Sequence, residues 1–153
     1  MNDQDLKFMT RAIELARQGV ENGDGGPFGC VVVKDGQIVG EGNNRVTSTN
    51  DPTAHAEIVA IRDAARRLGN YRLTGAVLCV TIEPCLMCVG ALVHARIKTL
   101  VYGAAEPRTG AAVSTVRGAE LPGHNHRVEI VGGVRESECR ELMQAFFKAR
   151  RTV

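Results

Sequence analysis

The stretch AVLCVTIEPCLMCVGALVH (residues 76–94) combines a buried strand with the helix that follows it. Residues 76–81 form a short continuous apolar run, which is typical of a strand buried on both faces. Pro84 suits the first turn of a helix, so we expect a helix from Cys85 to about His94. A buried strand that leads directly into a helix is the repeating unit of an α/β fold.

The segments that flank this stretch continue the alternation of strands and helices. Thr53 is a suitable cap for a helix that begins at Ala54 and is stopped by Gly69-Asn70 after Leu68. The further elements expected in this half of the chain are strands over 97–102 and 128–131 and a last amphipathic helix over 136–151.

The N-terminal third adds a helix and a hairpin. Apolar residues step by three or four from Leu6 to Val20, behind an Asp3 or Asp5 cap, and predict an amphipathic helix that ends near Gly19. Asp35-Gly36 separates two apolar runs, 28–34 and 37–42, and predicts a two-residue hairpin turn. Residues 43–52 are predicted to form a loop.

Together these elements predict an α/β fold of three layers, α/β/α, around a central mixed sheet of five strands. A chain of 153 residues with no repeat and no linker-like segment is expected to form a single domain over residues 1–153.

Composition narrows the function classes. Hydrophobic residues at 44% and charged residues at 24% exclude a disordered or collagen-like chain. A net charge of +2 excludes general coating of nucleic acid, so any contact with nucleic acid must be local. The polar start of the chain has no secretory pattern and no apolar run is long enough to span a membrane, so we expect a soluble, cytoplasmic protein with no membrane contact.

Cys85 and Cys88 are the first residues that carry chemistry. Their spacing puts both sulfurs on one face of the expected helix start, where unpaired N–H groups and the helix dipole favour thiolates. The chain has five cysteines, an odd number at irregular spacing, which argues against a disulfide framework. Cys30, Cys79 and Cys139 lie in strand or helix patterns and are interpreted as small core residues.

His55 completes a three-residue ligand set with this pair. Three protein ligands leave the fourth tetrahedral position of a zinc ion open for water, which is a catalytic arrangement. A closed structural zinc site would need a fourth side chain, and the remaining cysteines and histidines have no suitable spacing. A structural zinc site and a redox dithiol are the alternative readings.

Glu57 is the expected proton carrier beside this site. Two residues from His55, it would point away within a regular helix, but at a first turn both side chains can converge on an ion beyond the helix end. Zinc supplies hydroxide near neutral pH and a carboxylate can move the proton, which together predict hydrolysis. H-x-E followed by P-C-x-x-C is the signature of zinc-dependent nucleobase deaminases.

These motifs are similar to those of the cytidine deaminase-like superfamily, and most similar to bacterial tRNA-specific adenosine deaminases of the TadA type. The resemblance extends over nearly the whole chain and includes residues 50–57, 70–73, 80–85, 109–112, 125–129 and 146–151. It implies the cytidine deaminase-like fold, a homodimer, Zn2+ on His55, Cys85 and Cys88, and Glu57 as the catalytic residue.

The resemblance also implies a substrate, the wobble adenosine of a tRNA anticodon stem-loop, which is converted to inosine. Asn44 matches the asparagine that reads the base edge, although a loop-closing hydrogen bond is the alternative reading for a carboxamide there. Glu106 falls where the tRNA enzymes commonly carry Asp beside the neighbouring nucleotides; it could equally be a solvated loop acid.

The cations at the chain end have two readings as well. Lys148, Arg150 and Arg151 complement the dipole of the last helix, and they could also contact phosphates of the anticodon stem.

One segment departs from the tRNA branch. Gly25-Gly-Pro-Phe-Gly29 resembles guanine deaminases of the superfamily, and Phe28 is either a flat apolar wall of the pocket or a core aromatic. A free purine base such as guanine is therefore the alternative substrate, although the terminal segment with Trp associated with that branch is absent, since the chain has no Trp.

Overall fold

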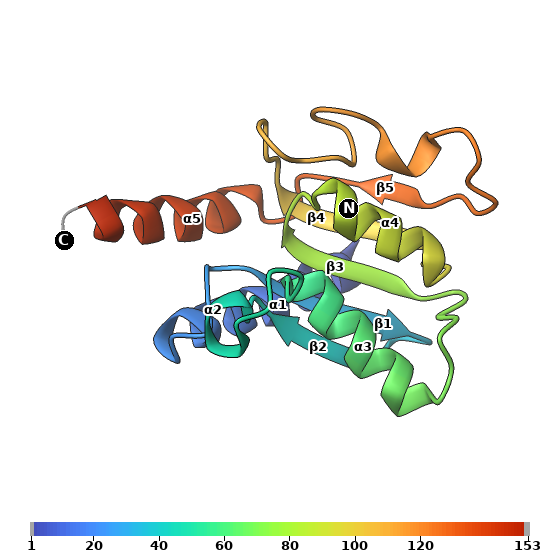
Figure 1. Ribbon diagram of the computed structural model, residues 1–153, viewed down its shortest axis with the longest axis horizontal. Helices are drawn as coiled ribbons and strands as arrows, with labels where there is room; N and C mark the ends of the chain where they lie inside the picture. Colours follow the sequence, from blue (N-terminus) through green and yellow to red (C-terminus); the bar gives the residue numbers. More distant parts are fainter. Residues whose placement is uncertain (1, 152–153) are drawn as a thin grey trace.

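The computed structural model describes residues 2–151 and contains one mixed sheet flanked by helices (Figure 1). The five strands are β1 (Gly29–Lys34), β2 (Gln37–Asn43), β3 (Val77–Ile82), β4 (Thr99–Ala104) and β5 (Glu129–Val131), in the spatial order β2-β1-β3-β4-β5. β1 is antiparallel to β2 and to β3, whereas β3, β4 and β5 are parallel. The predicted fold class, a three-layer α/β fold with a mixed five-stranded sheet, is confirmed.

Five α-helices and one short 3-10 helix accompany these strands among the described residues. They are α1 (Asp3–Glu21), α2 (Val46–Thr49), α3 (Ala56–Leu68), α4 (Leu86–His94), η1 (Gly118–Glu120) and α5 (Glu136–Arg151). No helix of the described chain has both the length and the apolar character needed to cross a lipid bilayer.

Each face of the sheet has its own core, because successive strand residues point to opposite sides. Leu78 and Val80 of β3 belong to the core that α3 and α4 cover. Cys79, which lies between them, belongs to the core that α1 and the first half of α5 cover. Cys30, Cys79 and Cys139 are all buried, as the sequence predicted.

The hairpin follows its predicted geometry. Asp35 and Gly36 have positive φ angles of 52° and 77°, as a type I′ turn requires, and Lys34 pairs with Gln37. Gly42 of β2 has a different role, because a Cβ there would lie 2.6 Å from the backbone oxygen of Ala56. The absence of that Cβ lets the start of α3 lie directly on the sheet.

Several predicted helix boundaries are wrong. α1 continues to Glu21 rather than ending near Gly19, and its cap is Asn2, which accepts from the N–H of Asp5, instead of Asp3 or Asp5. The predicted loop over residues 43–52 contains the short helix α2.

Thr53 does not cap α3, because its hydroxyl and N–H both donate to Asp51. That turn delays the helix, so the residue at its cap position is His55.

Pro84 precedes α4 rather than lying in its first turn. The N–H of Glu83 donates to Ala104 and the carbonyl of Pro84 accepts from Ala111, and these bonds hold the chain extended up to Cys85. β4 begins at Thr99, two residues later than predicted, because the N–H of Ile97 still bonds to Leu92 at the end of α4.

Candidate active site

The three predicted metal ligands meet at one end of the sheet. His55 is the cap residue of α3, Cys85 is the cap residue of α4, and Cys88 lies in the first turn of α4. The His55 side chain makes no cap bond to α3, so its ring is available to a ligand, and the Cys85 sulfur faces both His55 and Cys88. The positive ends of two helix dipoles therefore point at the same place, where they favour thiolate.

The distances fit a tetrahedral zinc ion. Nδ1 of His55 lies 3.6 Å from Sγ of Cys85 and 3.6 Å from Sγ of Cys88. Zinc bonds of about 2.0–2.1 Å to nitrogen and about 2.3 Å to sulfur place these atoms about 3.5–3.6 Å apart in a tetrahedron. Among residues 2–151, no other group of three or more metal-binding side chains gathers in this way. The three residues are thus compatible with a zinc site that leaves one corner open.

The electrostatics of the cluster suit a cation. Hydrogen bonds from Cys88 and from His55 lower the pKa of Cys85 to about 4, so this sulfur is a thiolate at neutral pH. The Cys85 thiolate in turn raises the pKa of His55 above its usual value. The hydrogen bond with Cys85, together with burial, raises the pKa of Cys88 above its usual value.

Glu57 lies beside this cluster and is only 4% exposed. Burial raises the pKa of its carboxyl above the usual value, although the nearby His55 acts in the opposite direction. The geometric objection to a His-x-Glu pair does not apply here, because His55 has an extended backbone (φ −68°, ψ 155°) outside the helix. A buried carboxylate with a raised pKa is a stronger base than an exposed one, so it is suited to accept a proton and pass it on.

A pocket of about 200 Å³ opens at this cluster. Phe28, Asn44 and Glu106 all line it, together with His55, Glu57 and Cys85. The volume lies below the roughly 300–1,000 Å³ typical of sites for drug-sized ligands, and it suits one flat base. Phe28 also packs against the core cluster under α3. Its contact with a substrate stays a prediction.

Asn44 makes the loop-closing bond, and its contact with the base edge stays a prediction. Its side-chain oxygen accepts from the N–H of Val46 at 3.1 Å, which closes the loop, while the residue lines the pocket. With its oxygen occupied in this way, the amide nitrogen is the group that can donate to a bound base.

The cations of the last helix lie farther from the cluster. Arg150 packs over the ring of Phe146 and, with Glu106, Arg108 and Arg140, lines a second groove of about 590 Å³ that adjoins the pocket at Glu106. Lys148 is exposed on α5 and lines neither cavity. Arg151 ends α5, and its side chain lies outside the described part of the chain.

Glu83 is a site residue whose role the sequence did not indicate. Its side chain is 2% exposed and accepts from the N–H groups of Glu106, Ala112, Val113 and Ser114, and also from the Ser114 hydroxyl. Two of the pocket residues, Glu106 and Thr109, belong to the loop that these bonds hold. One feature of the sequence could have indicated this role, namely an acidic residue between a buried strand and a helix. A carboxylate buried at such a place needs several hydrogen-bond donors.

The comparisons with known proteins agree with this geometry. Residues 2–104 match the model of the cytidine and deoxycytidylate deaminase zinc-binding region. The tRNA-specific adenosine deaminase of Haemophilus influenzae is 45% identical over 148 residues, which cover 96% of this chain and 85% of the relative. The chain belongs to the cytidine and deoxycytidylate deaminase family. It is a zinc-dependent hydrolytic deaminase, and the closed structural zinc site and the redox dithiol do not apply.

Two further similarities bear on the branch of the family. A solved structure from work on A-to-I editing by tRNA:A34 deaminases has 45% identity and a TM-score of 0.85, with 89% of this chain and 98% of that chain covered. Guanine deaminase of Bacillus subtilis is 55% identical over 97 residues, which cover 63% of this chain and 62% of the relative. Similarity to the adenosine deaminase therefore extends over 148 residues of this chain, and similarity to guanine deaminase over 97.

We expect Glu83→Gln to loosen the pocket and to lower the free energy of unfolding by about 2–4 kcal/mol, because buried N–H groups lose a charged acceptor. Burial alone would raise the pKa of Glu83, but the bonds from Ser114, Val113 and Glu106 lower it below its usual value. A carboxyl with a lowered folded-state pKa contributes stability above its unfolded value of about 4.5, and the contribution is lost as the pH falls through the folded value. Urea unfolding from pH 7 down to pH 3 measures both effects.

Glu120→Gln is the matched control, because Glu120 is an exposed carboxylate whose ion pair with Arg117 spans 3.9 Å. The wild type and the control should lose stability below pH 4.5, and Glu83→Gln should lose less. Equal acid sensitivity of all three proteins would show that Glu83 does not hold the loop.

Proposed function

We propose that this chain, as a single domain over residues 1–153, converts adenosine to inosine at the wobble position of tRNA. The strongest support is the extent of the similarity to a tRNA-specific adenosine deaminase, which covers 96% of this chain at 45% identity. Because the proposed substrate is tRNA, we also propose that the enzyme is cytoplasmic. The pocket supports the same substrate, since its size suits one base displaced from an RNA loop.

The proposed chemistry divides between the ligands and Glu57. His55, Cys85 and Cys88 would hold Zn2+, which supplies a water of lowered pKa when bound. Glu57 accepts a proton from the attacking water and passes it to the purine ring nitrogen as a bond forms between the water oxygen and C6. The C6–N bond then breaks with proton transfer to the amino group, so adenosine and water give inosine and ammonia.

The pocket walls orient the base for this step. Phe28 offers a flat apolar surface, and the amide nitrogen of Asn44 can donate to an acceptor on the base edge. Glu106 and Arg150 line the second groove, where we propose that they contact neighbouring nucleotides. We propose that Lys148 and Arg151 lie near phosphates of the anticodon stem.

A free purine base, in particular guanine, is the second candidate substrate. Phe28 and the identity of 55% with guanine deaminase over 97 residues support it.

Parallel assays distinguish the two substrates. We expect the zinc-loaded enzyme to release ammonia from an anticodon stem-loop that carries A at the wobble position and to produce inosine there. Free guanine should give no turnover above background. Turnover of guanine alone would overturn the tRNA proposal, and a stem-loop with A moved by one position tests the site of reaction.

Replacing Glu57 and Cys88 separates proton transfer from metal binding. Glu57→Ala should keep about one zinc per chain and reduce kcat by about 10²–10⁴-fold, because a general acid–base contributes this much. Cys88→Ser should lose most of the zinc together with the activity. Elemental analysis and ammonia release measure both, and deamination by zinc-loaded Glu57→Ala at the wild-type rate would contradict the assignment.

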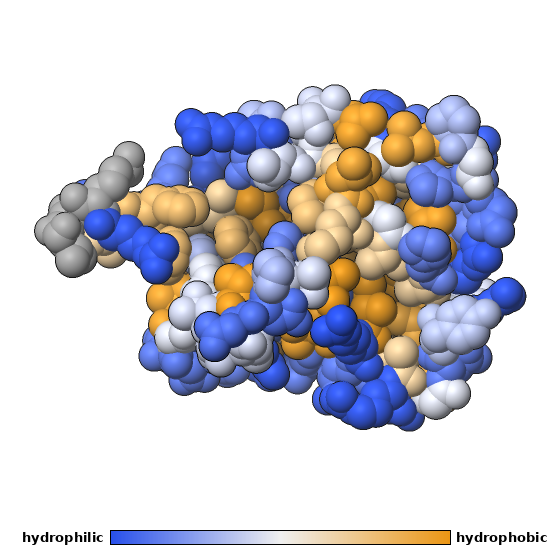
Figure 2. Space-filling view, viewed as in Figure 1, coloured by the Kyte–Doolittle hydropathy of each residue, from blue (hydrophilic) through white to orange (hydrophobic). Residues whose placement is uncertain are grey.

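We also propose a homodimer that forms through the apolar surface over α4. Figure 2 shows hydrophobic residues gathered over α4 and the chain beside it. The large exposed apolar residues of α4 are Leu86 and Met87, and those of the chain between β4 and β5 are Val113, Val116 and Leu121. A contiguous apolar surface of this kind is typical of an association site.

Met87→Glu/Leu121→Glu should convert the dimer into a monomer in sedimentation experiments, since two carboxylates would be buried in the interface. A charge at Met87 does not weaken α4, because an acid in the first turn favours the helix dipole. Val20→Glu on α1 is the control, with a side chain of similar exposure at 37%. A wild-type mass of 16.4 kDa, that of one chain, would refute the dimer.

A further inference from the structure

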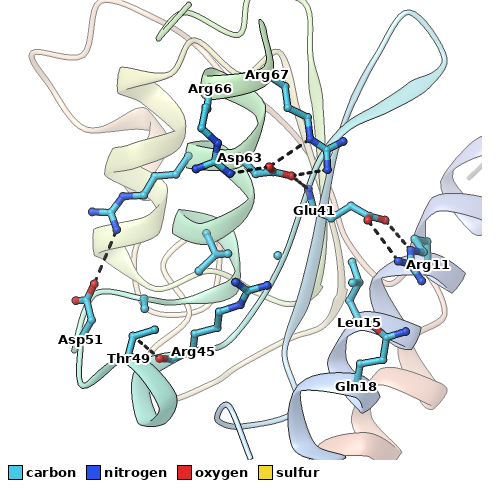
Figure 3. A pocket seen from close by; sticks show the side chains of 14 residues that line it. Arg11, Leu15, Gln18, Glu41, Arg45, Thr49, Asp51, Asp63, Arg66 and Arg67 are labelled. Atoms are coloured by element: carbon cyan, nitrogen blue, oxygen red, sulfur yellow. Dashed lines mark hydrogen bonds and ion pairs between the residues drawn. The ribbon is translucent and has the colours of Figure 1, made fainter. Parts of the chain in front are cut away.

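A third cavity, a hollow of about 530 Å³, lies on the outer edge of the sheet between α1, β2 and α3 (Figure 3). Its lining is unusually rich in cations. The arginines that line it are Arg11, Arg45, Arg62, Arg66 and Arg67. Figure 3 shows Arg45 pointing into the space between α3 and α1, with Arg66 and Arg67 above it.

Acidic residues neutralise only part of this charge. Nε of Arg11 lies 2.6 Å from Glu41, which raises the pKa of Arg11 and occupies both groups. Asp63 is shared by two cations, at 3.1 Å from Arg66 and 3.0 Å from Arg67. One carboxylate therefore faces two guanidinium groups.

The remaining two arginines have weak or neutral partners. Arg62 lies 3.8 Å from Asp51, whose other oxygen is bound by Thr53. Nε of Arg45 donates to the amide oxygen of Asn43, which carries no charge. Glu14, outside the lining, lies 2.9 Å from Arg11 and is the fourth acid that faces these cations, so five arginines against four acids leave an excess of one positive charge.

The hollow adjoins the candidate active site. Asn44 and His55 line the base pocket, and their chain neighbours Arg45 and Ala54 line the hollow. The N–H of Arg45 donates to the carbonyl of Ala54 at 2.9 Å, so these two chain segments form a shared wall. Along α3, Arg62 lies about 9 Å and Arg67 about 16 Å from the helix start, at about 1.5 Å per residue.

The chemistry of the lining favours phosphate over a base. Guanidinium groups match the geometry of phosphate oxygens and bind them through paired hydrogen bonds. No aromatic residue lines the hollow, so it offers no surface on which bases could stack. A strand of RNA that leaves the base pocket over the Asn44–Arg45 wall would meet these arginines next.

We propose that this arginine hollow binds phosphate groups of the RNA substrate outside the reacting nucleotide. The proposal rests on the proposed function, because it assumes that the substrate is RNA. It assigns the hollow a part in affinity and none in reading sequence, since phosphate contacts carry no base information.

The test compares two charge-neutralised double variants of the zinc-loaded protein. Arg62→Gln/Arg66→Gln removes two cations from the hollow. Lys34→Gln/Lys98→Gln removes two from the opposite end of the sheet, where β1 ends and β4 is about to begin. Anisotropy of a labelled stem-loop without the target A, from 50 to 200 mM NaCl, reports binding. Turnover of the reactive stem-loop gives KM and kcat.

We expect the hollow variant to bind RNA about tenfold more weakly and to raise KM by a similar factor. The slope of log affinity against log salt should fall in magnitude by about 1.4, since each phosphate contact on a single strand contributes about 0.7. The kcat should stay within about twofold of the wild type. The control should match the wild type in affinity and slope.

The outcomes separate this proposal from the proposed function. RNA that binds with the expected slope change but is not deaminated would support the hollow and refute the proposed function. If the wild type deaminates the stem-loop but the hollow variant matches the control in RNA affinity and salt slope, the phosphate-binding role of the hollow alone is refuted. A hollow variant that loses binding of inorganic tripolyphosphate but keeps its RNA affinity would also refute it, as a small-anion site. Absence of RNA binding by the wild type would overturn both.

Discussion

The central constraint on this molecule is that two helices from different parts of the chain must begin at the same point. Cys85 and Cys88 belong to α4, and His55 precedes α3, so the ligand set exists only if both helix starts are held against the sheet. The close approach of Gly42 to Ala56 holds one of them. The bonds of Glu83 and Pro84 to the end of β4 and the loop after it hold the other.

Negative charge collects at this point for a physical reason. A carboxylate, a thiolate and a second sulfur lie close together where burial would otherwise disfavour charge. Two helix N-termini offset part of this cost, and a divalent cation would offset the rest. The pKa values of the two buried carboxyls of this site are shifted in opposite directions by their surroundings. Hydrogen-bond donors lower the pKa of Glu83, whereas burial raises that of Glu57.

The sequence predicted the features that depend on local periodicity. The five strands, the hairpin at Asp35-Gly36 and the helix that carries Cys85 and Cys88 all followed from runs and turn signals. Errors arose where a side-chain hydrogen bond competes with the expected helix signal. Thr53 is an acceptable cap by type, but Asp51 holds both of its donors.

The candidate site was partly predictable in the same sense. The spacing of the three metal ligands was visible in the sequence. The convergence of His55 and Glu57 depends on the extended backbone at His55, which the sequence alone did not establish. The role of Glu83 could not be predicted because its donors lie 23 to 31 residues further along the chain. The arginine hollow draws on α1, β2 and α3, and no single segment indicates it.

The last helix has a consequence for dynamics. Figure 1 shows α5 extending away from the sheet, and its buried residue Cys139 lies in the first half, whereas Phe147 is 45% exposed. Backbone hydrogen bonds in a segment with so few buried contacts open at low free energy, without global unfolding. Amide hydrogen exchange should therefore be slow in the N-terminal half of this helix and fast toward its C-terminal end. A bound polynucleotide that fixes this end would bind less tightly by the free-energy cost of ordering it.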